Sequence, residues 1–272
     1  MNDRPENSNS GAPSETVVPD ERPFAAPARR LGPGDPLVWL KLGWADLRAA
    51  PRQSLSFGLL IVLASLAITA AAWRFGNLGI YLGVASGFVF VGPWLALIVY
   101  AISRRLEQGR RVSLRGCLAD AGLTLGNELV FAVIMIVVFL VWARAASMVH
   151  VFFPPDSDPQ LAELLPFLAV GSAVGAVFCA LIFAASAFSL PMMIDRRTDT
   201  ITAIVTSVNA VLRNKPAMAV WAAVIIACVL IGALTAWLAF IVLMPLLGHA
   251  TWHAYRDTID AGQWPALNGD RG

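Results

Sequence analysis

Two of the chain's three histidines stand four residues apart near its C-terminal end, in the stretch PLLGHATWHAYRD. On a helix the imidazoles of His249 and His253 would share one face, and paired imidazoles are ligands of zinc and copper ions. Asp257 continues the spacing, but it follows His249 by eight residues, which is ~12 Å along a helix axis. One ion therefore takes at most two ligands from this helix, and another would have to come from Asp195 or Asp46.

The plainer interpretation of the same stretch is the end of a membrane helix. Trp252 and Tyr255 accompany the two histidines, and amphipathic rings are enriched where helices leave the bilayer. Ionisable side chains at that boundary indicate function much less strongly than those at membrane depth. No cofactor is therefore predicted, and a metal at His249 and His253 is kept as the alternative.

Arginines are the other candidates for binding. Arg144 lies inside an apolar run, where its guanidinium would either contact an anion or lipid headgroup or extend along the helix to the membrane surface. Five more arginines follow another apolar run: Arg104, Arg105, Arg110, Arg111 and Arg115. They would either attract anionic lipid headgroups, at ~1 kcal/mol for each contact, or only set the topology. This basic group is too small to predict nucleic-acid binding.

Three apolar runs contain a proline that would kink or break a helix: Pro93, Pro191 and Pro245. Broken helices surround the substrate site in many transporters, so transport of a small molecule or lipid is an alternative function. Prolines also occur in spans without transport, and no predicted span has a central Asp, Glu or Lys for a proton relay. No nucleophile–base pair is recognisable, and the chain is not predicted to be an enzyme.

The composition indicates where these residues lie. Apolar residues make up 57% of the 272 residues, charged residues only 14%, and the mean hydropathy is +0.67. A soluble domain is nearer a quarter charged, so the chain is predicted to be an all-α integral membrane protein. Residues 1–36 hold few large apolar residues and are expected to form a disordered cytoplasmic tail. The cysteines Cys117, Cys179 and Cys228 form no paired motif and are expected to be small core residues.

Apolar runs long enough to cross a bilayer predict about six transmembrane helices. Four runs are distinct, and the uncharged stretch 217–255 would measure ~58 Å as one helix, so it is divided by a turn near 232–237. The predicted spans are 55–73, 79–101, 129–149, 164–194, 217–234 and 237–255. Gly171 and Gly175 in the fourth span have the spacing of a helix-packing contact.

The positive charges orient these spans. All lysines and arginines except Arg74 and Arg144 lie in segments that share one side of the predicted topology: 1–54, 102–128, 195–216 and 256–272. The loop 150–163, on the other side, contains none. By the positive-inside rule both termini are expected in the cytoplasm, including a C-terminal tail over 259–272.

A short amphipathic segment precedes each pair of spans, at 36–48, 112–122 and 199–213. These segments are expected to lie along the cytoplasmic membrane surface. Asp35 and Pro36 are placed to begin the first, and Asp199 to cap the third. The pattern predicts a repeat of one interfacial helix plus one membrane hairpin, over 36–108, 109–197 and 198–258.

Four successive stretches carry a family resemblance: WLKLGWADLRAAPRQSLSFGLL (39–60), GFVFVGPWLALIVYAISRRLEQG (87–109), SLPMMIDRRTDTITAIVTSVNAVLRNKPAMAVWA (189–222) and MPLLGHATWHAYRD (244–257). In this order they resemble the integral membrane family catalogued as domain of unknown function 2189. The resemblance implies a prokaryotic, polytopic protein of the bacterial inner membrane without an established activity. Some members are labelled cytochrome c oxidase subunit I-like, but a haem–copper core needs many more than three histidines.

Together these observations predict a non-enzymatic structural or accessory membrane component. Its basic cytoplasmic face would meet lipid or another membrane complex. A small-molecule or lipid transporter is the first alternative. A metal-binding accessory of a respiratory oxidase, acting through His249 and His253, is the second.

Overall fold

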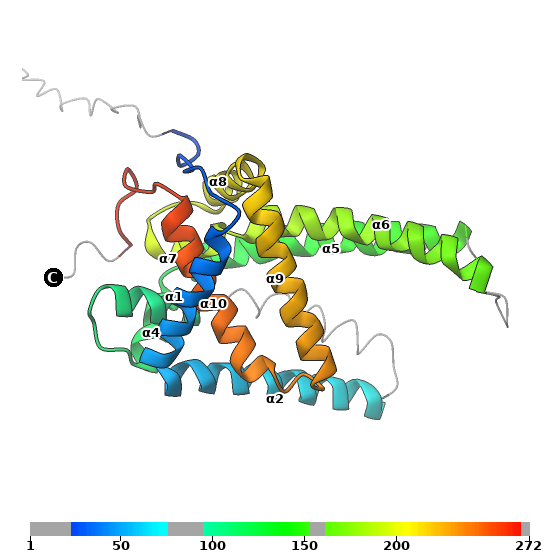
Figure 1. Ribbon diagram of the computed structural model, residues 1–272, viewed down its shortest axis with the longest axis horizontal. Helices are drawn as coiled ribbons and strands as arrows, with labels where there is room; N and C mark the ends of the chain where they lie inside the picture. The colour runs from blue at the N-terminus through cyan, green and yellow to red at the C-terminus, as the bar shows by residue number, and fades with distance from the viewer. Residues whose placement is uncertain (1–22, 76–94, 153–160, 268–272) are drawn as a thin grey trace, which may run out of the picture.

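The computed structural model describes residues 23–75, 95–152 and 161–267, and every regular element in these ranges is an α-helix (Figure 1). The helices are α1 (Asp35–Ala49), α2 (Pro51–Phe75), α4 (Leu114–Gly122), α5 (Leu125–Phe152), α6 (Leu161–Ser186), α7 (Ser189–Asp195), α8 (Thr200–Arg213), α9 (Lys215–Leu234) and α10 (Phe240–Thr258). Residues 95–107 are also helical. The predicted all-α class is confirmed.

Four helical stretches of the described ranges are long and apolar enough to cross a membrane: Pro51–Ile68, Leu125–Met148, Leu165–Asp195 and Lys215–Leu234. They coincide with four of the six predicted spans. The predicted span 79–101 falls largely outside the described residues, which include only its end from residue 95. α10 occupies the predicted span 237–255 but is not one of the four, because polar residues fill its second half.

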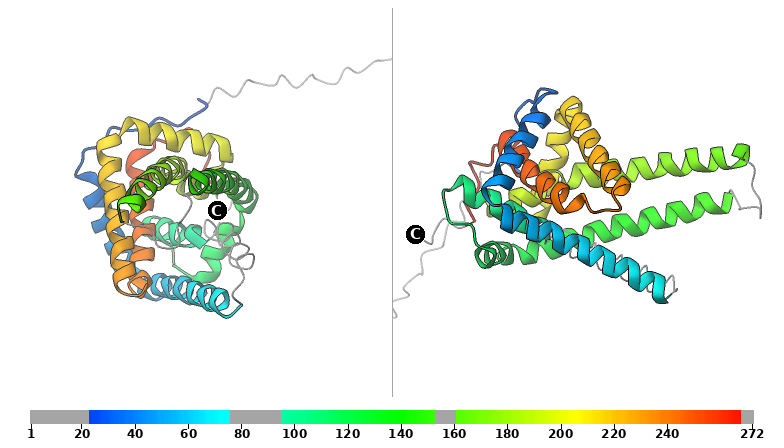
Figure 2. Two further views of the ribbon diagram at one scale, coloured as in Figure 1. Left: turned by 90° about the vertical axis from the view of Figure 1, so that its right-hand side faces the viewer. Right: turned by 60° about the horizontal axis from the view of Figure 1, so that its bottom comes forward.

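The hairpin of α5 and α6 projects from the other helices (Figures 1 and 2). Only 17% and 6% of their most apolar stretches are buried within the chain. The exposed apolar side chains include Leu140, Leu168 and Val177, and nothing lies within 4 Å of a Cβ built on Gly171 or Gly175. Apolar surface of this extent avoids water, so lipid or another protein must cover the hairpin.

Three short helices each begin a similar unit. α1 precedes α2 and helix 95–107, α4 precedes α5 and α6, and α8 precedes α9 and α10, which is the order of the predicted repeat. The Asp199 carboxylate accepts a hydrogen bond from the Thr202 backbone N–H at 2.9 Å and caps α8, as predicted. Pro36 lies in the first turn of α1, where its missing N–H leaves no helical bond unmade.

The turn between α9 and α10 falls at residues 235–239, close to the predicted place. Ala236 and Trp237 have φ angles of 49° and 68°, a region that non-glycine residues rarely adopt. The Trp237 N–H donates to the Gly232 carbonyl at 2.7 Å, and the Trp237 ring lies 5.3 Å from that of Phe240. These contacts stabilise the strained backbone of the turn. Residues 235–239 include no glycine or proline, which are the residues that usually indicate a turn in a sequence.

Glycines allow α10 to approach α1 and α2 closely. A Cβ on Gly43 of α1 would lie 2.7 Å from the Ala250 backbone nitrogen of α10. A Cβ on Gly58 of α2 would collide with the Ile241 carbonyl at the other end of α10. The backbones of three helices are therefore in direct contact, which fixes how far α10 is inserted between its neighbours.

The N-terminal segment corrects the predicted disordered tail over 1–36, because residues 23–36 are ordered. The Asn214 side chain at the end of α8 accepts a hydrogen bond from the Leu31 N–H and donates one to the Arg29 carbonyl, both at 2.9 Å. Hydrogen bonds to its backbone therefore hold this segment against α8, although it contains few large apolar residues. The first 22 residues lie outside the described ranges.

The segment after α10 returns across the ends of the other helices. Isolated β-bridges pair Ile259 with Ala28 and Ala266 with Arg196. The Leu267 N–H also donates to the backbone carbonyl of the residue that ends α7, at 3.0 Å. The predicted C-terminal tail is therefore packed against the chain over residues 259–267.

Candidate functional site

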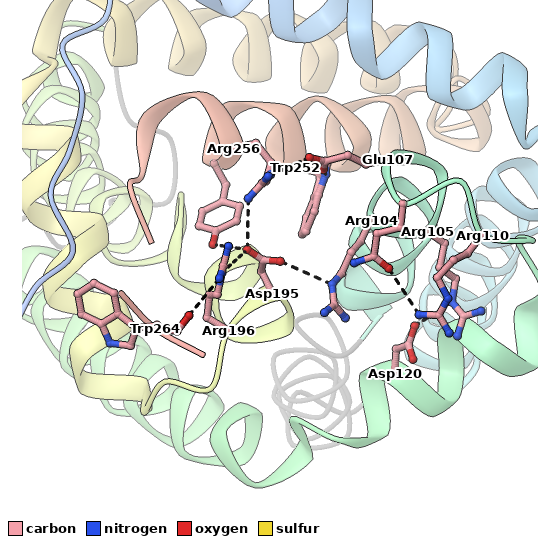
Figure 3. Close-up of polar contacts among 12 residues, drawn as sticks. Arg104, Arg105, Glu107, Arg110, Asp120, Asp195, Arg196, Trp252, Arg256 and Trp264 are labelled. Atoms are coloured by element: carbon pink, nitrogen blue, oxygen red, sulfur yellow. Dashed lines mark hydrogen bonds and ion pairs between the residues drawn. The ribbon is translucent and has the colours of Figure 1, made fainter. Parts of the chain in front are cut away.

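A buried polar cluster centred on Asp195 lies at the end of α7 (Figure 3). Asp195 Oδ2 accepts hydrogen bonds from the Tyr255 hydroxyl at 2.8 Å and from Arg196 Nε at 3.0 Å. The same oxygen lies 3.5 Å from Arg256 Nη1, and Asp195 Oδ1 lies 3.6 Å from Arg104 Nε. One carboxylate thus interacts with three guanidinium groups.

The cluster joins all three units of the fold. Arg104 comes from helix 95–107, Asp195 from α7, and Tyr255 and Arg256 from α10, so the second half of every hairpin contributes. The segments YAISRR (100–105) and HAYRD (253–257), which end the first and third hairpins, each place an arginine here. Since a buried charge without its partner is costly, the three helix ends stabilise one another only when all are in place.

Glu107 supplies a second carboxylate, which neutralises positive charge on the outer side of the cluster. Its Oε1 accepts a hydrogen bond from Arg256 Nε at 3.0 Å, and its Oε2 accepts one from the Trp252 indole N–H at 2.9 Å. Burial lowers the pKa of Arg256, but the charges of Glu107 and Asp195 outweigh burial, and the pKa is raised above its ordinary value. Both oxygens of the Glu107 carboxylate are therefore engaged within the chain.

A separate ion pair fastens α4 to helix 95–107. Arg105 Nε donates to Asp120 Oδ2 at 2.8 Å, and Arg105 Nη2 donates to the Gly116 carbonyl at 2.9 Å. A Cβ on Gly116 would collide with the guanidinium. Glycine is thus required at this position for the arginine to reach the backbone of α4.

These pairs correct the predicted lipid contact for two of the five clustered arginines. Arg104 and Arg105 are buried, with 3% and 9% exposure, and are not presented on the surface of the chain. The partner of Arg104 is Asp195, which is distant in sequence, and the partner of Arg105 is Asp120 on the short helix α4. The spacing of the arginines predicted neither pair. The other three, Arg110, Arg111 and Arg115, are exposed, as is Arg144 on α5, and lipid contact by these four side chains stays a prediction.

His249 is completely buried between two serines. Its Nε2 lies 2.9 Å from Ser54 Oγ on α2, and its Nδ1 lies 2.7 Å from Ser103 Oγ on helix 95–107. The Ser54 hydroxyl donates to the Ala50 carbonyl at 2.9 Å, so it accepts from the imidazole. The Nε2–H of His249 therefore donates to Ser54. Complete burial favours the neutral imidazole, in which Nδ1 accepts from the Ser103 hydroxyl.

His253 has other partners. Its Nε2 lies 2.9 Å from Asp46 Oδ2 on α1, and the neighbouring Asp257 accepts a hydrogen bond from the Trp39 indole N–H at 2.9 Å. The two histidines thus connect α10 to different helices. Within the described residues no group of three or more His, Cys, Asp and Glu side chains is placed to hold a metal ion, so a metal at His249 and His253 stays a prediction.

The three prolines have different surroundings. Helix α6 ends at Ser186 and α7 begins at Ser189, so the break lies just before Pro191. α10 continues through Pro245 as one helix. Pro93 lies outside the described residues.

Glu128 is a candidate that the sequence reasoning missed. It lies at the start of α5 with 3% exposure, and neither carboxylate oxygen has a hydrogen-bond partner. Among the described residues Arg104 is also a buried ion with unmade hydrogen bonds, at its Nε and Nη1. Glu128 flanks an apolar run like many surface residues, so only its burial reveals it.

Two cavities open beside the Asp195 cluster. The larger, about 550 Å³, lies between α1 and the end of α10 and includes Arg29, His253 and Asp257 in its lining. The smaller, about 230 Å³, is lined by Arg104 and Asp195. Arg196, Arg256 and Glu107 line both, so the cluster separates the two cavities.

The fold and the exposed apolar helices define an all-α integral membrane protein in contact with the lipid bilayer. Residues 80–195 match the family described as "Predicted integral membrane protein (DUF2189)", which confirms the resemblance seen in the sequence. No curated protein and no solved structure matches the chain.

Proposed function

We propose that the chain is a non-enzymatic structural or accessory component of the bacterial inner membrane, without a resident cofactor, that packs against another membrane protein. The observation that carries this proposal is the projecting α5–α6 hairpin (Figure 2). Apolar side chains such as Leu140, Leu168 and Val177 are more than half exposed, and no described atom lies within 4 Å of a Cβ built on Gly171 or Gly175. Small residues at this spacing let a second helix approach closely.

The orientation is part of the proposal. Arg104, Arg196 and Arg256 come together at one end of the described helices, together with the exposed arginines that follow helix 95–107. A single basic end supports the assignment of this face, and of both termini, to the cytoplasm. Maleimide labelling of single cysteines at positions 115 and 157 in intact cells tests it. Labelling of 115 but not 157 by an impermeant reagent contradicts the orientation.

A photo-crosslinking amino acid on the hairpin tests for the partner. Leu140 of α5, Val177 of α6 and Ile226 of α9 are equally exposed, at 59%. The proposal expects a discrete protein adduct in membranes from the first two positions and none from the third. Adducts of lipid alone at all three positions contradict it.

Transport of a small molecule or lipid is the second candidate. The break before Pro191 and the buried, unpartnered Glu128 favour it, because broken helices and buried acids accompany substrate sites in transporters. Altered uptake or lipid composition in a deletion strain, restored by the native chain but not by Glu128→Gln, supports transport over the structural role.

A further inference from the structure

The smaller cavity beside Asp195 is built from charged side chains that the chain holds in place. It measures about 230 Å³, which accommodates a phosphate group, and its lining includes Arg104, Glu107, Asp195, Arg196, Trp252 and Arg256. Three guanidinium groups face two carboxylates, so the cavity carries one uncompensated positive charge. The site and the accessory role proposed above are independent of each other.

The two carboxylates of the cavity are occupied by neighbours. Glu107 accepts from Arg256 and Trp252 through its two oxygens. Asp195 Oδ2 accepts from Tyr255 and Arg196, and its Oδ1 forms the ion pair with Arg104 at 3.6 Å. Little negative charge therefore remains uncompensated to repel an incoming anion.

Arg104 supplies the free donors. Its side chain is 3% exposed, and its Nε and Nη1 make no hydrogen bond, because Asp195 Oδ1 at 3.6 Å is an ion pair beyond hydrogen-bond distance. Burial lowers the pKa of Arg104, and the charge of Asp195 only partly restores it. A buried guanidinium with unmade hydrogen bonds is expensive, and such a group needs an acceptor.

We propose that this cavity binds a phosphate group, which accepts hydrogen bonds from the guanidinium of Arg104. Phosphate oxygens match the guanidinium geometry, and a phosphate neutralises the surplus charge. Arg196 and Arg256 provide the surrounding positive field while they remain paired with their carboxylates. The phosphate belongs either to a soluble ion or to a lipid headgroup that enters from the membrane surface.

The first arm of the test measures soluble phosphate. The full chain purified in detergent is titrated calorimetrically with inorganic phosphate at constant ionic strength, with chloride as the reference. The second arm measures lipid, by native mass spectrometry of the chain from nanodiscs of phosphatidylcholine with or without phosphatidic acid. Binding in the first arm identifies a soluble phosphate, and retention of phosphatidic acid alone identifies a headgroup.

Variants decide whether binding occurs at this cavity. Arg104→Gln should weaken binding on the order of tenfold to a hundredfold, the equivalent of a lost charged hydrogen bond. Gln108→Glu adds a negative charge at the exposed edge of the same cavity without disturbing a buried group, and it should weaken binding several-fold. Arg213→Gln, which changes an exposed arginine at the end of α8 outside the lining, is the matched control.

The outcomes separate the possibilities. Loss of binding in Gln108→Glu with unchanged binding in Arg213→Gln supports the site even if Arg104→Gln does not fold. Absence of binding in both arms, or equal binding by all variants, overturns the proposal.

Discussion

The hydroxyl of Tyr255 donates a 2.8 Å hydrogen bond to Asp195 Oδ2, across 60 residues of sequence. The same carboxylate pairs with Arg256 of the same helix, α10, and with Arg104 of helix 95–107, so one acidic side chain at the end of α7 holds three helix ends together. Several consequences of this arrangement, and of the packing around it, are measurable.

Asp195→Asn should be strongly destabilising. The substitution leaves Arg104 buried without its counter-charge, which costs about 3–5 kcal/mol when one partner of a buried ion pair is removed. Tyr255→Phe removes one hydrogen bond and should cost only about 1 kcal/mol. Thermal and chemical unfolding in detergent measure both, and exposed Asp260→Asn is the control. A loss at Asp195 no larger than that at Asp260 would show that the ion pairs do not stabilise the fold.

His249→Ala should destabilise the chain by about 3 kcal/mol, from two lost hydrogen bonds and the cavity left behind. Ser103→Ala should cost about 1 kcal/mol, and a double-mutant cycle should show that the two effects are coupled. Metal analysis of the purified chain accompanies the series. One equivalent of zinc or copper that disappears in His249→Ala would favour the metal hypothesis over the purely structural role.

Gly43→Ala and Gly171→Ala should act in opposite directions. Both glycines are helical, but a methyl group at Gly43 meets the Ala250 backbone, whereas one at Gly171 meets nothing. Overpacking should cost about 1–3 kcal/mol at the first position, while alanine at the second should be neutral or slightly stabilising through its helix propensity. Equal melting temperatures for the two variants would contradict the close contact of α1 with α10.

Asp199 should contribute a pH-dependent cap. Burial raises its pKa, but hydrogen bonds, chiefly from Thr202, outweigh burial, and the net pKa is lowered. A lowered pKa means that the stabilisation is present above the unfolded-state value of about 3.9 and is lost as the pH falls through the folded value. Asp199→Ala should therefore cost about 1 kcal/mol at pH 7 and progressively less as the pH is lowered through the folded-state pKa of Asp199. Unfolding across this pH range measures the difference, and a constant loss at all pH values would refute the charged cap.

The helices and their order follow largely from the sequence. Apolar runs, the cap at Asp199, the proline at position 36 and the break before Pro191 are local features that predict helix positions without tertiary information. The division of 217–255 near residue 235 was also predictable, because a single helix of that length exceeds the bilayer. The tail was misjudged because residues 23–36 are held by backbone hydrogen bonds to α8, which composition does not report.

The candidate site was less predictable. His249, His253 and the arginines near residue 104 are visible as residue types, yet their partners depend on how distant helices meet. Spacing along one helix suggested a shared metal at the two histidines, whereas Ser54 and Asp46 approach them from separate helices. The placement of the positive charges in the sequence suggested that the clustered arginines are free on the surface. In the structure two of them, Arg104 and Arg105, are buried in ion pairs with Asp195 and Asp120.

The sequence by itself determined that this is a helical membrane protein, because apolar run length and the placement of positive charge act locally on each segment. Only the tertiary structure decided which charges are paired, which histidine is neutral and buried, and which donors of Arg104 remain free. Those properties depend on distances between residues far apart in the chain, and a hydrogen bond or ion pair forms only when the folded backbone brings its two atoms into contact.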